Sequence, residues 1–486
     1  MERHFPVIRA FSLLLFFFGL TMLVPLGYSL AIDDGAHFAY DEGIVASCLA
    51  AVLFWYPTRR YKQDLKLRDG FLIVVMIWTL LPAFSTIPLM SWYWPKLSFT
   101  DAYFEAMSGL TTTGATVLSD LDKLPPSINL WRGQLVWMGG MGLVVLAVAV
   151  FPMLGIGGRQ MFKAETPGPM KDSKMTPRIT QTAKGLWGVY LLFTIACALS
   201  LWLAGMTPFD AVMHTFATMG LGGFSSHDSS YGYWNSPLIE GVTVVFMLLA
   251  GFNFATHFMA LSGRSWKPYR GDPEVRWFLA VTLLSVLIIA IYLLEFNVYP
   301  TFAEAFRHSL FNTVSIATTT GFASVDYNLW PIWAPLWMLF LSSFATSAGS
   351  TGGGIKMMRA ILLYKQVYRE LLRAIHPNAV VPVKVGGESI PPQILFAVLA
   401  FAFAYMCIIA ALTLVMTFTG LDIVTAFSAV VASINNTGPG LNQVGPATTF
   451  AVLTDLQTWI CTLAMLLGRL EIFSLLVVLT PAFWRR

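Results

Sequence analysis

Four short segments of the chain combine Thr, Asn and Gly in a way that suits the binding of a monovalent cation. None of them contains Asp, Glu, Lys or Arg, so a ring of charged side chains is excluded as the source of selectivity. Backbone carbonyl groups remain, and rings of carbonyls can replace the hydration shell of such an ion. Each segment ends in glycine, which accepts a positive φ without a Cβ clash. The segments are Thr111–Gly114, Gly220–Gly223, Thr318–Gly321 and Asn435–Gly438.

Each segment closes a stretch of 14 residues, and the four stretches align without gaps at 101–114, 210–223, 308–321 and 425–438. The pattern predicts a short amphipathic helix, too short to cross a bilayer, followed by an extended loop. Irregular backbone at membrane depth is tolerated only where it is buried in protein or lines a water-filled cavity. Four such units around an axis would supply that cavity, and each helix would direct its partial negative pole at it. The alternative is that these segments are ordinary outer loops rich in turn residues. That alternative would explain a single such loop better than it explains four loops that align in register.

The composition places these segments in a membrane protein. Of 486 residues, 56% are apolar and only 12% are charged, about half the charged share of a typical soluble domain. Ten largely charge-free runs are near the length of about 20 residues that a spanning helix needs. The runs are 10–32, 43–58, 70–95, 133–158, 185–209, 241–263, 277–294, 327–355, 389–421 and 456–484.

The basic residues set the expected orientation. Most Lys and Arg residues fall at the two termini and in the connections 59–68, 159–184, 264–276 and 356–384. Loops rich in Lys and Arg stay in the cytoplasm. The sequence therefore predicts a multi-pass protein with both termini cytoplasmic.

A second unusual feature is the run GSTGGG at 349–354, inside a long apolar stretch. A phosphate-binding loop is excluded, because Ile355 separates Gly354 from Lys356 and the motif needs Gly-Lys-Ser/Thr. Close helix packing would explain one or two of the glycines. The whole run should instead unwind a helix, and broken helices at mid-membrane depth often mark ion paths.

Arg469 is the third feature, a charge near the middle of the last apolar run. A charge at the bilayer centre costs about 2.5–3.5 kcal/mol even on the lenient insertion scale, so it should face a cavity or a partner. Pairing with Glu471 is the alternative, although residues two apart point to different faces of a helix. Apart from Glu471 no acid lies deep in an expected span, so we expect no enzyme.

With these residues in view, the chain resembles a TrkH-type subunit of the Trk/Ktr/HKT superfamily of potassium transporters. The resemblance covers essentially the whole chain, including two leading spans typical of the bacterial branch. It rests on TTTGAT (111–116), GLGGFS (220–225), TTTGFAS (318–324), NNTGPGL (435–441), AGSTGGGIK (348–356) and GRLEIF (468–473).

The resemblance implies that each repeat contributes one strand of a potassium filter with one key glycine. Relatives that prefer sodium often have serine at the first key glycine, which here is Gly114. The implied potassium contacts are Thr111, Thr112, Gly220, Leu221, Thr318, Thr319, Asn435 and Asn436. The remaining filter residues are Thr113, Gly114, Gly222, Gly223, Thr320, Gly321, Thr437 and Gly438. The implied gate consists of Gly349, Ser350, Thr351, Gly352, Gly353, Gly354, Lys356 and Arg469.

The expected fold is all-α, with two N-terminal helices followed by four span–pore helix–span repeats around a central pore. The expected divisions are 1–68 for the leading helices and 69–184, 185–276, 277–388 and 389–486 for the repeats. The resemblance further implies a homodimer on a cytosolic TrkA-type ring that binds NAD(H) or ATP/ADP. Loops 159–184, 264–276 and 359–388 are candidate docking surfaces, unless their basic residues only enforce topology.

The predicted function is potassium uptake across a bacterial inner membrane, with potassium as transported ion and no cofactor bound by this chain. No nucleic-acid partner is expected. Two alternatives stay open. One is a coupled symporter that moves potassium with a proton or sodium ion, and the other is a receptor or scaffold that does not conduct.

Overall fold

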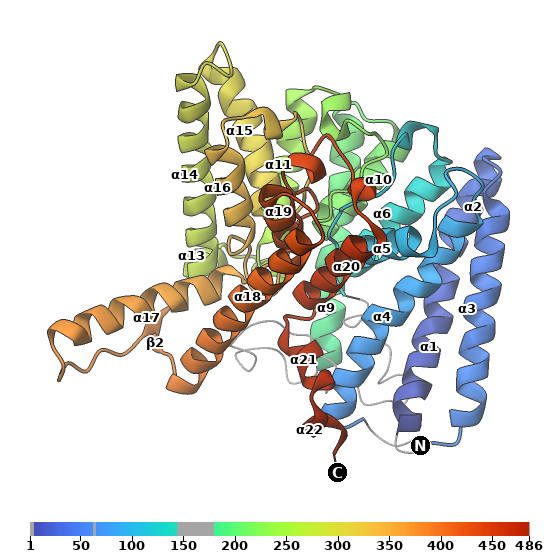
Figure 1. Ribbon diagram of the computed structural model, residues 1–486, viewed down its shortest axis with the longest axis horizontal. Helices are drawn as coiled ribbons and strands as arrows, with labels where there is room; N and C mark the ends of the chain where they lie inside the picture. Colours follow the sequence, from blue (N-terminus) through green and yellow to red (C-terminus); the bar gives the residue numbers. More distant parts are fainter. Residues whose placement is uncertain (1–3, 62–64, 143–178, 486) are drawn as a thin grey trace.

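The computed structural model describes residues 4–61, 65–142 and 179–485. The described chain is helical except for one small hairpin, in which β1 (Lys384–Val385) pairs antiparallel with β2 (Glu388–Ser389). Most long helices run in roughly the same direction, while α17 (Met357–Ile375) projects away from the body (Figure 1). The two ends of the chain lie at the same end of the molecule, as an even number of crossings requires.

The helices confirm a multi-pass membrane protein. Within the described residues, six helices are long and apolar enough to cross a membrane, and two bent pairs raise the number to eight if each pair is one span. The six are Phe5–Ile32, His37–Thr58, Arg68–Ser91, Ala183–Leu203, Pro273–Glu295 and Pro392–Phe418. The bent pairs are Pro237–Gly251 with Phe254–Ser262, at 95°, and Asp455–Arg469 with Phe473–Leu479, at 109°.

Expected spans 241–263 and 456–484 are the two bent pairs, and two further expected spans are not continuous helices in the described chain. Run 133–158 begins in α6 (Pro126–Gly140), and its continuation from residue 143 lies outside the described residues, as does most of loop 159–184. Run 327–355 contains only the short α16 (Trp333–Ser342), after which residues 343–356 leave the helical conformation. This second difference follows from the Gly/Ser/Thr content of that stretch, which lowers helix propensity.

Four short helices occupy the predicted 14-residue stretches. Each has a Ser, Thr or Asp N-cap whose side chain accepts the N–H three residues further on, which fixes where the helix starts. At 12–16 residues they are too short to cross a bilayer. These pore helices are α5 (Phe99–Leu110), α10 (Pro208–Gly220), α15 (Phe302–Ala317) and α19 (Ile423–Ile434).

Each pore helix packs between the helix before it and the helix after it in the same repeat. The preceding helices are α4 (Leu67–Ser91), α9 (Ile179–Leu203), α14 (Pro273–Glu295) and α18 (Pro392–Phe418). The following helices are α6, α11 (Pro237–Gly251), α16 and α20 (Asp455–Arg469). Each following helix also packs against the next pore helix, α6 on α10, α11 on α15, α16 on α19 and α20 on α5. The last of these contacts closes the four repeats into a ring.

The remaining helices flank this ring. Ahead of the repeats, α1 (Phe5–Thr21), α2 (Leu23–Ile32) and α3 (His37–Thr58) pack against one another and α4. Between and after the repeats lie α12 (Phe254–Ser262), α13 (Lys267–Gly271), α21 (Phe473–Leu479) and α22 (Pro481–Trp484). Single 3₁₀ turns occur at Leu121–Lys123, Ser230–Tyr233, Tyr327–Leu329, Asn442–Val444 and Phe450–Val452.

Candidate functional site

The four segments that follow the pore helices, Thr111–Gly114, Gly220–Gly223, Thr318–Gly321 and Asn435–Gly438, are called the filter strands below. They share one backbone conformation despite their different sequences. The N–H of the third residue in each turns back to the carbonyl five residues earlier, at 2.8–3.0 Å, for instance Thr113 to Ser108 and Gly222 to Ala217. The second residue of each is left-handed, which is uncommon outside glycine. These second residues are Thr112, Leu221, Thr319 and Asn436, with φ of 58°, 56°, 60° and 53°.

The key glycines bring the four filter strands into a closed ring. A Cβ on Gly114 would lie within 3.0 Å of Gly223, and one on Gly223 within 3.0 Å of Thr320 and Gly321. A Cβ on Gly321 would meet Thr437, and one on Gly438 would meet Thr113 of the first strand, again within 3.0 Å. Each strand therefore touches the next in the order one, two, three, four, one. No side chain fits at these contacts.

The first two carbonyls of each strand differ from most buried backbone carbonyls of a protein. Among the residues that the structure describes, the carbonyl oxygens of the first two residues of each segment accept no hydrogen bond. Buried backbone carbonyls normally find a partner, and a dehydrated cation would supply one. These residues are Thr111, Thr112, Gly220, Leu221, Thr318, Thr319, Asn435 and Asn436, the eight for which the family resemblance implies potassium contacts.

Buried polar side chains on the pore helices anchor each strand just beyond its key glycine. Three residues after the glycine, a backbone N–H donates to such a side chain in three repeats: Val117 to Glu105 Oε2 at 3.1 Å, Ser324 to Asn312 Oδ1 at 3.1 Å and Leu441 to Ser428 Oγ at 2.8 Å. In the second repeat, His214 Nε2 lies 2.9 Å from Ser225 Oγ. Because His214 Nδ1 faces the Asp210 carbonyl at 2.9 Å, Nδ1 donates and Nε2 accepts from the Ser225 hydroxyl.

Glu105, which occupies an equivalent position to His214 and Asn312 in the 14-residue stretch, has an additional partner. Its Oε1 accepts from Arg132 Nε at 2.8 Å, and both side chains are fully buried. Arg132 Nη1 also donates to the Ser225 carbonyl at 3.2 Å, so the pair connects the first and second repeats. Sequence reasoning missed these anchors, although the gapless alignment contained a signal: polar residues stand at the fifth position of three stretches.

A glycine loop, residues 343–356 between α16 and α17, lies against the filter strands on the side opposite the key glycines. Gly353 N–H donates to Thr319 Oγ1 at 2.9 Å, and Thr351 Oγ1 donates to the Met219 carbonyl at 3.0 Å. A Cβ on Gly353 would collide with the Asn435 carbonyl. The loop thus contacts the strands of the third and fourth repeats directly, and in the second repeat it contacts the end of pore helix α10, one residue before the strand. Its Lys356, 5% exposed, donates through Nζ to the Gly352 carbonyl.

Arg469 connects this loop to the first repeat. Its Nη1 lies 3.4 Å from Thr112 Oγ1 and 3.3 Å from the Thr351 carbonyl. Its Nη2 donates to the Gly139 carbonyl at the end of α6, and the guanidinium lies 5.0 Å from the centre of the Trp78 ring. The expected juxtaposition of Arg469 and the glycine run is present in the structure.

Pairing of Arg469 with Glu471 is ruled out as the explanation of this half-buried charge. Glu471 instead forms an ion pair with Arg359 in the first turn of α17. Both Glu471 and Ile472 have a positive φ, which turns the chain sharply between α20 and α21. The two charges two residues apart therefore serve different partners.

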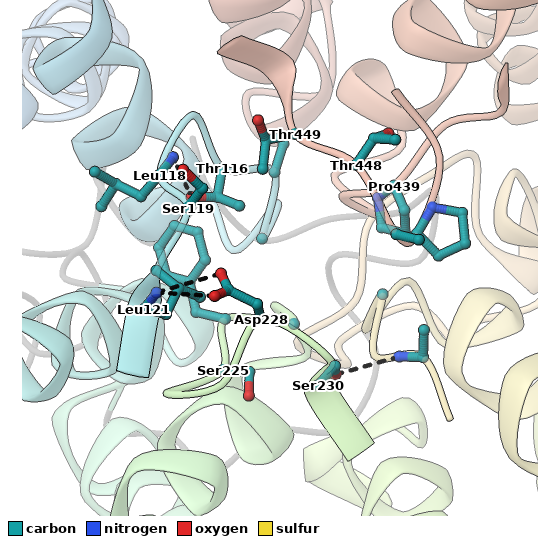
Figure 2. Close-up of a pocket in the computed structure, with 18 of the residues that line it drawn as sticks. Thr116, Leu118, Ser119, Leu121, Ser225, Asp228, Ser230, Pro439, Thr448 and Thr449 are labelled. Carbon is teal, nitrogen blue, oxygen red and sulfur yellow. Dashed lines mark hydrogen bonds between the residues drawn. The ribbon is translucent and has the colours of Figure 1, made fainter. Parts of the chain in front are cut away.

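A cavity of about 210 Å³ opens on the key-glycine side of the ring (Figure 2). Gly114, Gly223 and Gly321 form part of its lining, as do loop residues such as Thr116, Asp228 and Thr448 from three repeats. His227 lines it as well, with Nδ1 on Asp122 and Nε2 3.3 Å from Asp210 Oδ1. Among the described residues no cluster of His, Cys, Asp and Glu could hold a metal ion. The cavity and the glycine loop thus lie on opposite sides of the strands.

The fold and this site define an all-helical multi-pass membrane protein in which four repeats surround a ring of re-entrant strands. The chain belongs to the TrkH family of cation transport proteins, whose family model matches residues 36–485. Membership of a transport family, and not an enzyme family, agrees with the expectation from the sequence.

Curated relatives and a solved structure match the chain over its length. It is 48% identical over 481 residues to the Trk system potassium uptake protein TrkH of Vibrio parahaemolyticus, covering 99% of each chain. It is 39% identical over 472 residues to the Trk system potassium uptake protein TrkG of Escherichia coli, covering 97% of each. The crystal structure of the potassium transporter TrkH from Vibrio parahaemolyticus matches with a TM-score of 0.90 at 46% identity, over 99% of each chain.

Proposed function

We propose that this chain takes up potassium across a bacterial inner membrane, through the ring of four filter strands. The observation that carries the proposal is the ring itself: four strands of one conformation, in mutual contact, whose first two carbonyls have no hydrogen-bond partner in the described chain. Such carbonyls suit a monovalent cation that has shed its water. Relatives that share nearly half of its residues are named potassium uptake proteins.

Within this proposal the carbonyls of Thr111, Gly220, Thr318 and Asn435 and of the residue after each bind the ion. Pore-helix ends contribute a partial negative charge at the same place, which favours a cation. The contacts between strands support selectivity, because a ring whose members touch cannot expand freely around a differently sized ion. Glycine at all four key positions favours potassium over sodium.

The glycine loop and Arg469 form the gate in this proposal. The loop contacts the third and fourth filter strands and the end of pore helix α10 in the second repeat, and Arg469 contacts the first strand, so together they cover one side of the ring. A fixed guanidinium repels a cation strongly in a medium of low dielectric constant. Permeation therefore requires the loop and Arg469 to move, which breaks their hydrogen bonds to the strands.

The setting of the chain completes the proposal. Both termini face the cytoplasm, the repeats follow the divisions 69–184, 185–276, 277–388 and 389–486, and two chains associate as a dimer. A cytosolic TrkA-type ring that binds NAD(H) or ATP/ADP docks on the cytoplasmic loops and controls the gate. Relatives are named as parts of a Trk system, which supports a separate regulatory subunit.

Rubidium and sodium uptake into liposomes that contain this chain alone tests the proposal, with and without an imposed proton or sodium gradient. Rubidium uptake that needs neither gradient, with little sodium uptake, is the expected result. Uptake only in the presence of a gradient would make the chain a coupled symporter. Absence of rubidium uptake even from the ungated Arg469→Ala variant would contradict conduction and favour a receptor.

A further inference from the structure

One carboxylate oxygen of Glu274 binds two backbone N–H groups that lie on either side of the GSTGGG run. Glu274 Oε1 accepts from Ala348 N–H at 2.8 Å and from Met358 N–H at 3.0 Å. The glycine run of residues 349–354 lies between these two donors in the chain. Since the same atom holds both, the loop cannot lengthen or slide without breaking at least one of the bonds.

The position of Glu274 is itself fixed by its neighbours. Glu274 is 3% exposed and is the second residue of α14. Its own N–H donates to the N-cap residue Asp272 through Oδ1 at 2.9 Å, and Asp272 Oδ2 accepts from Thr256 Oγ1 of α12 at 2.9 Å. A buried carboxylate held at a helix N-terminus is favourably placed relative to the helix dipole.

A second contact joins α12 to the same loop. Phe254 N–H donates to the Gly349 carbonyl at 3.1 Å, and a Cβ on Gly349 would lie 2.8 Å from Asn253 Oδ1. The connection that follows α12 carries three exposed basic residues: Arg264, Lys267 and Arg270. The N-terminal turn of α12 and the glycine loop are therefore attached to each other twice, once through Gly349 and once through Asp272 and Glu274.

We propose that Glu274 is a positioning residue for the gate, which holds the glycine loop against the filter strands by binding both of its ends. This inference rests on the proposed function, because it takes the loop as the gate. A displacement of α12 reaches the loop through Asp272 and Glu274. Glu274 touches neither a filter strand nor the transported ion, so its effect is on the closed state and not on ion selectivity.

The test compares resting rubidium flux in liposomes for Glu274→Ala, Glu274→Gln and the matched control Glu295→Ala. Glu295 is exposed at the other end of α14. Alanine leaves two buried N–H groups unsatisfied, and losing hydrogen bonds to a charged group raises the open fraction roughly tenfold. Glutamine keeps an oxygen that accepts both N–H groups, so its flux stays near wild type, as does that of the control. The rubidium-to-sodium ratio stays unchanged in all three.

The reference variant Arg469→Ala separates the failure of this inference from failure of the gate. If Arg469→Ala raises resting flux and Glu274→Ala does not, the role of Glu274 is overturned and the gate stands. If neither raises it, the gate is contradicted and Glu274 with it. If Glu274→Ala does not fold, a second comparison uses amide hydrogen exchange of segment 343–358 in Glu274→Asp and in Glu274→Gln. The aspartate side chain is one methylene too short to reach both N–H groups, whereas glutamine reaches both. Faster exchange in the aspartate variant supports the inference, and equal exchange overturns it.

Discussion

The amide of Asn436 donates to the hydroxyl of Thr113 at 3.0 Å, and this bond joins the last filter strand to the first. The same Nδ2 also donates to the Met465 carbonyl of α20 at 3.0 Å. Asn436 and Thr113 are 323 positions apart in the chain. The ring of strands is thus closed by a side-chain contact in addition to the close approach of Gly438 to the first strand.

Asn436→Ala should lower the preference for rubidium over sodium. The substitution removes both donors and loosens the closing contact, so the ring adapts more easily to an ion of different size. Relative rubidium and sodium uptake in liposomes measures the effect. Thr113→Ser is the matched control, because it keeps the hydroxyl that accepts the bond and should behave as wild type. Unchanged selectivity in Asn436→Ala would show that the bond plays no part in the filter.

Gly114→Ser should strongly reduce selectivity for potassium. Gly114 has φ 79°, and any Cβ there collides with Gly223 of the next strand. Gly420→Ser controls for backbone strain alone, since Gly420 has φ 97° with open space around it. Selectivity in rubidium-against-sodium uptake should fall for the first variant and stay constant for the second. A receptor or scaffold that does not conduct predicts no difference between them.

Arg469→Ala should raise resting cation flux, because the fixed charge beside Thr112 and Thr351 is removed. Arg469→Lys should lie between wild type and alanine. An ammonium keeps the charge but lacks the planar fork that reaches several acceptors at once. Resting rubidium flux in the absence of any cytosolic subunit is the measurement. Equal fluxes in all three proteins would remove Arg469 from the gate.

Glu105→Gln should destabilise the folded protein by about 3–5 kcal/mol, the usual cost of leaving one member of a buried ion pair without its partner. Arg132 is the residue left behind, and both side chains are fully buried. Thermal unfolding in detergent measures the loss. Lys123→Ala is the control, because it breaks only the exposed ion pair with Asp120 and should leave the unfolding temperature unchanged. A normal unfolding temperature for Glu105→Gln would argue against this anchor.

His227 should make the stability of the outer loops depend on pH. Burial lowers the pKa of His227, but its interactions with Asp210 and Asp122 raise it more, so its pKa lies above the ordinary value. The Tyr233 ring stacks on the imidazole of His227 with the ring centroids 3.6 Å apart, and the Trp234 ring meets it at 82° with the centroids 5.0 Å apart. Protonated His227 therefore stabilises these loops fully below the unfolded-state pKa of about 6.5, and this contribution is lost as pH rises through the raised pKa.

The unfolding temperature measured from about pH 5.5 upward should accordingly fall with rising pH, within the range that a raised histidine pKa covers. His227→Gln should flatten that dependence. A wild-type profile that is identical to the profile of the variant would exclude His227 as its source.

The short helices, the segments that follow them and the unwound glycine run could be predicted from the sequence because their signals are local. The 14-residue stretches repeat without gaps, and a run such as GSTGGG disfavours a helix wherever it stands. The boundaries of the pore helices follow from capping residues such as Ser98 and Asp422, which are equally local.

What could not be predicted depends on residues far apart in the chain. Tyr405 donates to Asn435 Oδ1 at 2.5 Å, and the Asn435 amide donates to Ser343 Oγ at 3.0 Å. The ion pair of Arg359 with Glu471 spans 112 positions. No spacing rule indicates such contacts, because they arise from how the repeats pack. For the same reason, the apolar content of run 327–355 predicted a span where the glycine loop instead binds to filter strands.

The most direct test of the central claim is the anomalous scattering of rubidium in crystals of this chain grown or soaked without potassium. A potassium filter built from these strands predicts an anomalous peak inside the ring, within coordination distance of the carbonyls of Thr112, Leu221, Thr319 and Asn436. It also predicts that this peak weakens when sodium replaces rubidium and persists in Arg469→Ala. An ordered ring that holds no rubidium peak would contradict the claim that these carbonyls form a potassium filter.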